Sequence, residues 1–140
     1  MRFMILVKAS KDSEAGVLPS KELIAAMGKF NETMMQAGVL LAGEGLQPSS
    51  KGARIKFSGG KRTVTDGPFT ETKETLGGYW MIQVKSKAEA VEWASRCPAS
   101  DHEVIEVRQV FEMSDFPADV QEAAARFPEM QAQSGQRKGS

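Results

Sequence analysis

The chain has 140 residues, a length that suits one domain, and its 18 basic residues balance its 18 acidic residues. This net charge of zero argues against electrostatic recruitment to nucleic acid or to an anionic membrane, and no apolar run approaches the roughly 20 residues that span a bilayer. Cys97 is the only cysteine, which excludes an intrachain disulfide and a cysteine-based metal cluster and fits a reducing, cytoplasmic environment.

Short apolar strands and one amphipathic helix are predicted in the N-terminal part. Residues 3–7 form a continuous apolar run, typical of a central strand that is covered on both faces. Ser20 is a candidate cap for a helix that stops at Gly38, and apolar side chains recur along this helix. They are Leu23, Met27, Phe30 and Met34. Residues 39–42 predict a second strand.

A β-hairpin is predicted next. Residues 53–57 alternate apolar and basic side chains, which is typical of a half-exposed strand. Gly59 and Gly60 both tolerate positive φ, as a tight turn requires, so residues 63–65 are expected to return as the partner strand. The polar segment 66–77 lacks periodicity and is predicted to be an ordered loop.

The C-terminal part repeats the pattern of strand, helix and strand. Residues 79–84 predict a strand, and Ser86 and Glu89 have the spacing of a capping box for a helix that reaches about Arg96. Residues 104–111 predict the last strand. The apolar side of the helix is expected to consist of Ala90, Val91, Trp93 and Ala94.

This order of elements predicts an α+β, ferredoxin-like fold with a mostly antiparallel sheet, two helices on one face and an added β-hairpin. The strands carry apolar residues on both sides, so we expect a second copy of the chain to cover the other face in a homodimer. The domain is expected to span residues 1–112. Residues 113–140 form a C-terminal extension, with a short helix over 120–127 and disorder over the last ten residues.

One segment of the chain has a recognisable signature. The run TDGPFTETKE from Thr65 to Glu74, followed by Gly77, Gly78 and Tyr79, resembles the DGPF subgroup of YCII-related proteins. The resemblance extends over residues 1–112 and implies a ferredoxin-like fold of the dimeric α/β-barrel type, without implying a settled reaction. Members of the subgroup are often encoded beside extracytoplasmic-function sigma factors, which implies a regulatory link.

The same loop contains the candidate catalytic residues. In the wider YCII group, a histidine on the first helix and an aspartate are suspected of acid–base chemistry, but here Met27 stands in the place of that histidine. From the residues themselves, Asp66 and Glu74 are candidate catalytic acids, because three acids and a lysine lie within nine residues of a Gly-Pro loop. The Asp-Gly-Pro run equally suits a structural turn, in which the Asp66 side chain accepts hydrogen bonds from its own loop.

Other polar and aromatic side chains are candidates for ligand binding. Tyr79 and Trp80 alternate along a strand, so one is expected in the core and the other on a pocket or dimer face. Arg108 suits either a substrate carboxylate or a structural salt bridge. His102 is the only histidine, which excludes a histidine-rich zinc site; no metal or other cofactor is expected. The candidate ligand-binding residues are Phe69, Glu71, Lys73, Tyr79 and Arg108.

Two functions are compatible with these features. The first is a dimeric protein that binds a small molecule or acts in regulation, with the link to sigma factors that the resemblance implies. The alternative is a small-molecule enzyme in which an acidic residue of the loop performs acid–base chemistry. The expected partners are a second copy of the chain and a small ligand, without direct contact with nucleic acid or a membrane.

Overall fold

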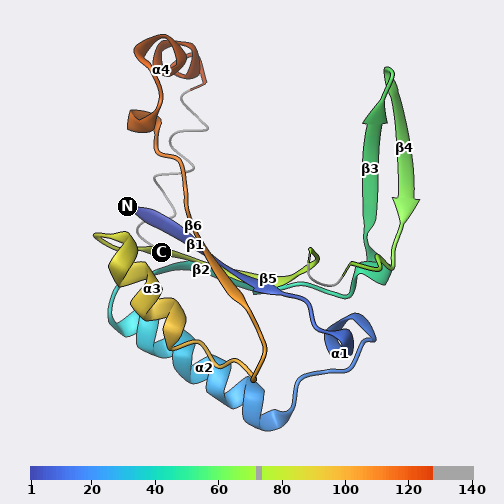
Figure 1. The fold of residues 1–140 in the computed structure, drawn as a ribbon. Helices are drawn as coiled ribbons and strands as arrows, with labels where there is room; N and C mark the ends of the chain where they lie inside the picture. Colours follow the sequence, from blue (N-terminus) through green and yellow to red (C-terminus); the bar gives the residue numbers. More distant parts are fainter. Residues whose placement is uncertain (72–73, 128–140) are drawn as a thin grey trace.

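The computed structural model describes residues 1–71 and 74–127, and a four-stranded antiparallel sheet lies at its centre (Figure 1). The strand order is β2-β5-β1-β6, so the strands of the two strand–helix–strand halves interleave as in ferredoxin-like folds. The predicted α+β fold is therefore confirmed. The four strands are β1 (Arg2–Lys8), β2 (Leu40–Gly45), β5 (Leu76–Gln83) and β6 (Ile105–Gln109).

Two helices, α2 (Lys21–Gln36) and α3 (Lys87–Ser95), cover one face of the sheet (Figure 1). Trp80 is the aromatic residue of β5 that enters the core; its ring meets that of Phe30 edge to face, at 5.1 Å between centroids. The prediction that Val91 belongs to the apolar side of this helix is wrong, because Val91 is 46% exposed on the outer side of α3. The largest fully buried side chains are Phe3, Ile5, Met34 and Ile82.

The helix ends follow the predicted signals closely. The Ser20 hydroxyl accepts a hydrogen bond from the N–H of Leu23, and Gly38 takes a φ of 73° just beyond the helix. At α3, the Ser86 hydroxyl accepts from the N–H of Glu89. The Glu89 carboxylate binds the N–H of the residue before Ser86 rather than that of Ser86 itself, so only half of the predicted capping box forms.

The hairpin is a separate two-stranded sheet of β3 (Ala53–Ser58) and β4 (Lys61–Asp66). The turn glycines Gly59 and Gly60 have φ values of 56° and 76°, as predicted. The hairpin stands away from the main sheet, on the side opposite α2 and α3 (Figure 1). Every residue of both strands is exposed, so the prediction of a half-exposed strand is wrong: no layer of the described chain covers either face.

Short helical elements connect these parts. The sequence did not predict α1 (Lys11–Glu14) or the 3₁₀ turns at Ser49–Lys51 and Met113–Asp115. The predicted C-terminal helix is present as α4 (Ala118–Ala124), and the predicted disorder of the last ten residues lies outside the described residues. Among the described residues, no helix is long and apolar enough to cross a membrane.

The sheet face opposite the helices has no covering element within residues 1–71 and 74–127 (Figure 1). Strand register places Met4 beside Met81, and Leu6 beside Tyr79, on this face, since directly opposed residues point to the same side of a sheet. We call it the open sheet face. Its described residues are Arg2, Met4, Leu6, Lys8, Ala42, Glu44, Tyr79, Met81, Gln83, Glu106 and Arg108.

Candidate functional site

The loop that follows β4 begins with the run Asp66–Phe69, and we call it the DGPF loop. It is anchored on one buried serine. Ser49 is 7% exposed, and its hydroxyl donates a hydrogen bond to the Glu14 carboxylate while it accepts one from the N–H of Phe69 at 2.9 Å. The N–H of Ser49 also donates to Glu14, at 2.8 Å. The end of α1, the 3₁₀ turn and the DGPF loop are thus joined at a single side chain.

Gly67 allows the loop to approach this anchor. Its N–H donates to the carbonyl of Gly52 at 3.0 Å, which holds the two backbones side by side. A Cβ atom at position 67 would lie 1.8 Å from the carbonyl oxygen of Ser49, far inside van der Waals contact. The glycine of the DGPF run is therefore a steric requirement of this contact.

A pocket of about 390 Å³ lies between the DGPF loop and the segment that follows β2. We call it the loop pocket. The guanidinium carbon of Arg54 lies 3.9 Å from the centroid of the Phe69 ring, so the two planar groups form part of its wall. The loop pocket is lined by Leu46, Gln47, Pro48, Ser49, Lys51, Gly52, Arg54, Phe69, Glu74, Thr75 and Leu76.

The loop pocket is surrounded by charges of both signs. Arg54 and Lys51 carry positive charge at its wall and Glu74 carries negative charge. Glu71 lies beside it, 3.4 Å from the Arg54 guanidinium. Hydrogen bonds from the Thr70 hydroxyl and from the Glu71 backbone, together with Arg54, lower the pKa of Glu71, so that it stays a carboxylate at neutral pH and is not a proton donor.

The DGPF loop places its predicted site residues in different surroundings. Glu74 and Phe69 line the loop pocket. Asp66 is exposed at the base of the hairpin, paired with Ala53. Within the described chain its carboxylate accepts no hydrogen bond, so the expected side-chain turn is absent. Lys73 lies outside the described residues.

Two of the predicted ligand-binding residues lie elsewhere. Tyr79 and Arg108 belong to the open sheet face. Arg108 pairs with Glu106 at 3.2 Å; hydrogen bonding from Arg108, with the nearby Lys8, lowers the pKa of Glu106. The structure therefore groups only part of the predicted residues around the loop pocket.

The residues Glu14, Ser49 and Arg54 belong to this site but were not identified from the sequence. Ser10 and Ser13, which cap α1 reciprocally, give the only local signal, since they fix the short helix that ends at Glu14. The contact of Glu14 with Ser49 spans 35 residues, and no local pattern indicates it. Arg54 has the spacing of an exposed hairpin residue, and only the fold brings Phe69 beneath it.

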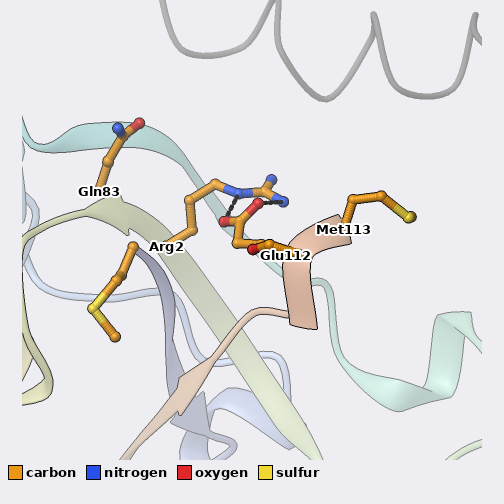
Figure 2. A pocket seen from close by; sticks show the side chains of 6 residues that line it. Arg2, Gln83, Glu112 and Met113 are labelled. Atoms are coloured by element: carbon orange, nitrogen blue, oxygen red, sulfur yellow. Dashed lines mark hydrogen bonds and ion pairs between the residues drawn. The ribbon is translucent and has the colours of Figure 1, made fainter. Parts of the chain in front are cut away.

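A second hollow, of about 410 Å³, lies near the N-terminus (Figure 2). Figure 2 shows the Arg2 side chain paired with Glu112 through two hydrogen bonds, at 2.8 and 3.2 Å. The Glu112 carboxylate therefore already occupies the guanidinium of Arg2. This ion pair joins β1 to the C-terminal segment. The loop pocket, where Arg54 stacks on a ring, is therefore the better candidate site.

The remaining reactive groups contribute little to a site. Burial, with the charge of nearby Glu103, raises the pKa of the Cys97 thiol to about 11, so it is protonated and unreactive at neutral pH. His102 is exposed beside Asp101. Across residues 1–71 and 74–127, no three histidine, cysteine or acidic side chains are grouped closely enough to hold a metal ion.

The anchor at Ser49 is expected to make stability depend on acid pH. Hydrogen bonds from the Ser49 hydroxyl and N–H lower the pKa of Glu14 below its ordinary value of 4.5. The stability that Glu14 contributes is therefore complete well above pH 4.5 and is lost as the pH falls through the lowered pKa of the folded state. Urea denaturation from pH 7 to pH 3 should show the stability gap between the wild type and Glu14→Gln narrowing towards acid.

Glu122→Gln, on the exposed surface of α4, is the charge-matched control for this measurement. We expect its stability relative to the wild type to stay constant over the same pH range. A constant gap for Glu14→Gln as well would contradict the role of this carboxylate.

Comparison with known proteins adds three findings. The family model for the YCII-related domain matches residues 1–114. An uncharacterized protein of Rhizobium meliloti (strain 1021) is 35% identical over 85 residues; the match covers 61% of this chain and 64% of that protein, less than two thirds of its length. The solved structure of 5-chloro-2-hydroxyhydroquinone dehydrochlorinase (TftG) from Burkholderia phenoliruptrix AC1100, in complex with 2,5-dihydroxybenzoquinone, aligns with 84% of this chain and 100% of its own, at 15% identity and a TM-score of 0.41.

Proposed function

Because the chain belongs to the YCII-related domain family, we propose that it is a homodimer that binds a small planar anion in the loop pocket. The stack of Arg54 on Phe69 is the observation that carries the proposal. The ring fixes one face of the guanidinium, which leaves its N–H edge to bind a carboxylate in a bidentate way. Leu46 and Leu76 supply apolar contacts for the body of the ligand, and Lys51 adds a second positive charge.

The contact between Arg54 and Glu71 is weak enough for a ligand carboxylate to replace Glu71 as the partner of Arg54. Its length of 3.4 Å is long for a charge-assisted hydrogen bond, and both side chains are about half exposed. An exposed pair of this kind contributes little to stability. A ligand carboxylate that binds the same guanidinium at shorter distance therefore displaces Glu71 at low cost.

We propose that the open sheet face is the interface of the dimer. Met4, Leu6 and Met81 form its apolar centre, and charged residues such as Arg2 and Glu106 lie around them. An apolar centre with a charged margin is typical of a surface that a partner covers. A second copy would bury it through a twofold axis, in which the same patch serves both subunits.

The position of Glu74 favours an enzymatic activity as the second candidate function. Glu74 lines the loop pocket, and a small-molecule enzyme with an acidic loop residue would use a carboxylate of this kind to take a proton from a bound ligand. Asp66 lies outside this lining, so Glu74 is the better placed of the two predicted acids. The link to extracytoplasmic-function sigma factors stays a prediction from resemblance.

Ligand binding is tested with benzoate as the simplest planar anion. Titration followed by amide NMR should shift the signals of Gly52 and Leu46, and Arg54→Met should weaken binding by about tenfold or more. Arg62→Met, which removes the other arginine of the hairpin, is the matched control and should leave the affinity unchanged. Equal binding of uncharged benzamide, or unaltered binding to Arg54→Met, would contradict the proposal.

The dimer is tested by sedimentation at micromolar concentration. The wild type should have about twice the chain mass of 15.2 kDa, and Met81→Lys should be monomeric, because it places a charge at the centre of the open sheet face. Val91→Lys, on the outer side of α3, makes the same kind of change away from this face and should stay dimeric. A monomeric wild type refutes the dimer.

A further inference from the structure

The β3–β4 hairpin, which we call the hairpin arm, has two chemically different faces. Its register pairs Ile55 with Val64 and Phe57 with Arg62, so these four side chains share one face. Ile55, Val64 and Phe57 are 56%, 63% and 70% exposed. The opposite face carries basic and hydroxyl side chains: Arg54, Lys56, Ser58, Lys61, Thr63 and Thr65.

The hairpin arm has little support from the rest of its own chain. It is held at its base, by the hydrogen bond from Gly67 to Gly52 and by the stack of Arg54 on Phe69. Beyond the base its strands pack chiefly on each other and stand clear of the main sheet (Figure 1). An isolated two-stranded hairpin is only marginally stable in water, and burial of its apolar face would stabilise it.

The position of the hairpin arm indicates what covers that face. The arm rises on the same side of the sheet as the open sheet face, at one end of it (Figure 1). Any body that covers the open sheet face therefore lies within reach of the arm. The arm and the open sheet face together form one surface, with apolar residues on both parts.

The area that a dimer needs points to the same conclusion. The open sheet face has four strands, and standard strand spacing and rise give it a flat footprint of roughly 400 Å². A stable interface buries about 800 Å² on each partner. One face of the arm adds roughly 200 Å² by the same geometry, and in a twofold dimer each subunit both supplies an arm and receives one. The arm that a subunit supplies and the area beside its open sheet face that receives the partner's arm each add roughly 200 Å² to the roughly 400 Å² of that face, so each subunit reaches about 800 Å².

We propose that the apolar face of the hairpin arm packs against a second copy of the chain, so that each subunit of the dimer holds the other with its arm. This inference rests on the proposed homodimer. It also explains the contrast between the two faces, since the basic face remains in water while the apolar face is buried. Because Arg54 and the loop pocket lie at the base of the arm, the ligand site would then border the dimer interface.

The test compares two threonine variants of the full chain by sedimentation equilibrium. Phe57→Thr removes the largest apolar side chain of the arm and keeps a residue that favours strands, so the dimer dissociation constant should rise about tenfold to a hundredfold. Lys56→Thr changes the adjacent residue on the opposite face and should leave the constant unchanged. Circular dichroism melting confirms that both variants remain folded.

A second measurement follows the arm directly. Amide hydrogen exchange in residues 53–66 should be slow in the dimeric wild type and fast in monomeric Met81→Lys. A dimeric wild type whose dissociation constant is unaffected by Phe57→Thr, with equally fast exchange of the arm in both states, would overturn the arm contact and leave the dimer standing. A monomeric wild type would overturn both.

Discussion

Replacing Gly67 with alanine is expected to displace the DGPF loop and to lower the free energy of unfolding by roughly 3 kcal/mol or more. The added Cβ would lie 1.8 Å from the carbonyl oxygen of Ser49. That oxygen is a backbone atom, and it already accepts the N–H of Gly52 at 2.9 Å, so it cannot rotate out of the way as a side chain would. The loop must move, and the hydrogen bond from Phe69 to Ser49 is lost with it.

Gly45→Ala is the matched control for this variant. Gly45 lies at the end of β2, and a Cβ atom there meets nothing within 4 Å, so its stability should stay close to that of the wild type. Urea denaturation compares the two variants, and amide NMR reports whether Phe69 has moved. If Gly67→Ala is as stable as Gly45→Ala, the close approach of the loop to Ser49 does not exist in solution.

The second large effect is expected from Ser49→Ala, which should lower the free energy of unfolding by about 1–3 kcal/mol. The change removes the hydroxyl that accepts from Phe69 and donates to Glu14, and so leaves a part-buried N–H without its partner. Phe69 carries one wall of the loop pocket, so benzoate should also bind more weakly to this variant.

Two controls separate the anchor from a general effect of losing a hydroxyl. Ser50→Ala changes the exposed neighbour in the same 3₁₀ turn and should be nearly neutral. In the double variant Ser49→Ala with Glu14→Gln, the two losses of unfolding free energy should be less than additive, because both substitutions weaken the same pair of hydrogen bonds between Ser49 and Glu14. Fully additive losses would show that the two residues act independently.

Local sequence signals were sufficient for most of the fold. Ser20 and Gly38 bound α2, and Gly59 with Gly60 sets the hairpin turn, because capping and positive φ depend on neighbouring residues alone. The alternation of Tyr79 and Trp80 also indicated that one enters the core. The error at Val91 has a simple cause: α3 is short, and its contact with the sheet uses only the narrower stripe of Ala90, Trp93 and Ala94.

The candidate site was predictable only as a segment. The seven candidate residues lie near the DGPF run or on strands close to it in the sequence. In the structure, strand register places Tyr79 and Arg108 on the open sheet face, whereas Phe69 and Glu74 line the loop pocket. Proximity in sequence could not separate these two surfaces. It also could not identify Arg54, whose role depends on where the hairpin base meets the loop.

By itself, the sequence determined the order of the main elements, the ferredoxin-like fold and the position of the DGPF loop, since periodicity, capping and turn chemistry act over a few residues. The requirement for glycine at position 67 comes from the tertiary contact with Ser49. The tertiary structure alone decided that Glu14, Ser49 and Phe69 form one anchor, and that Arg54 rather than Asp66 lies at the loop pocket. The contacts of the anchor join segments that are 20 and 35 residues apart. Such pairings arise from packing and close backbone approach, which leave no periodic trace in the chain.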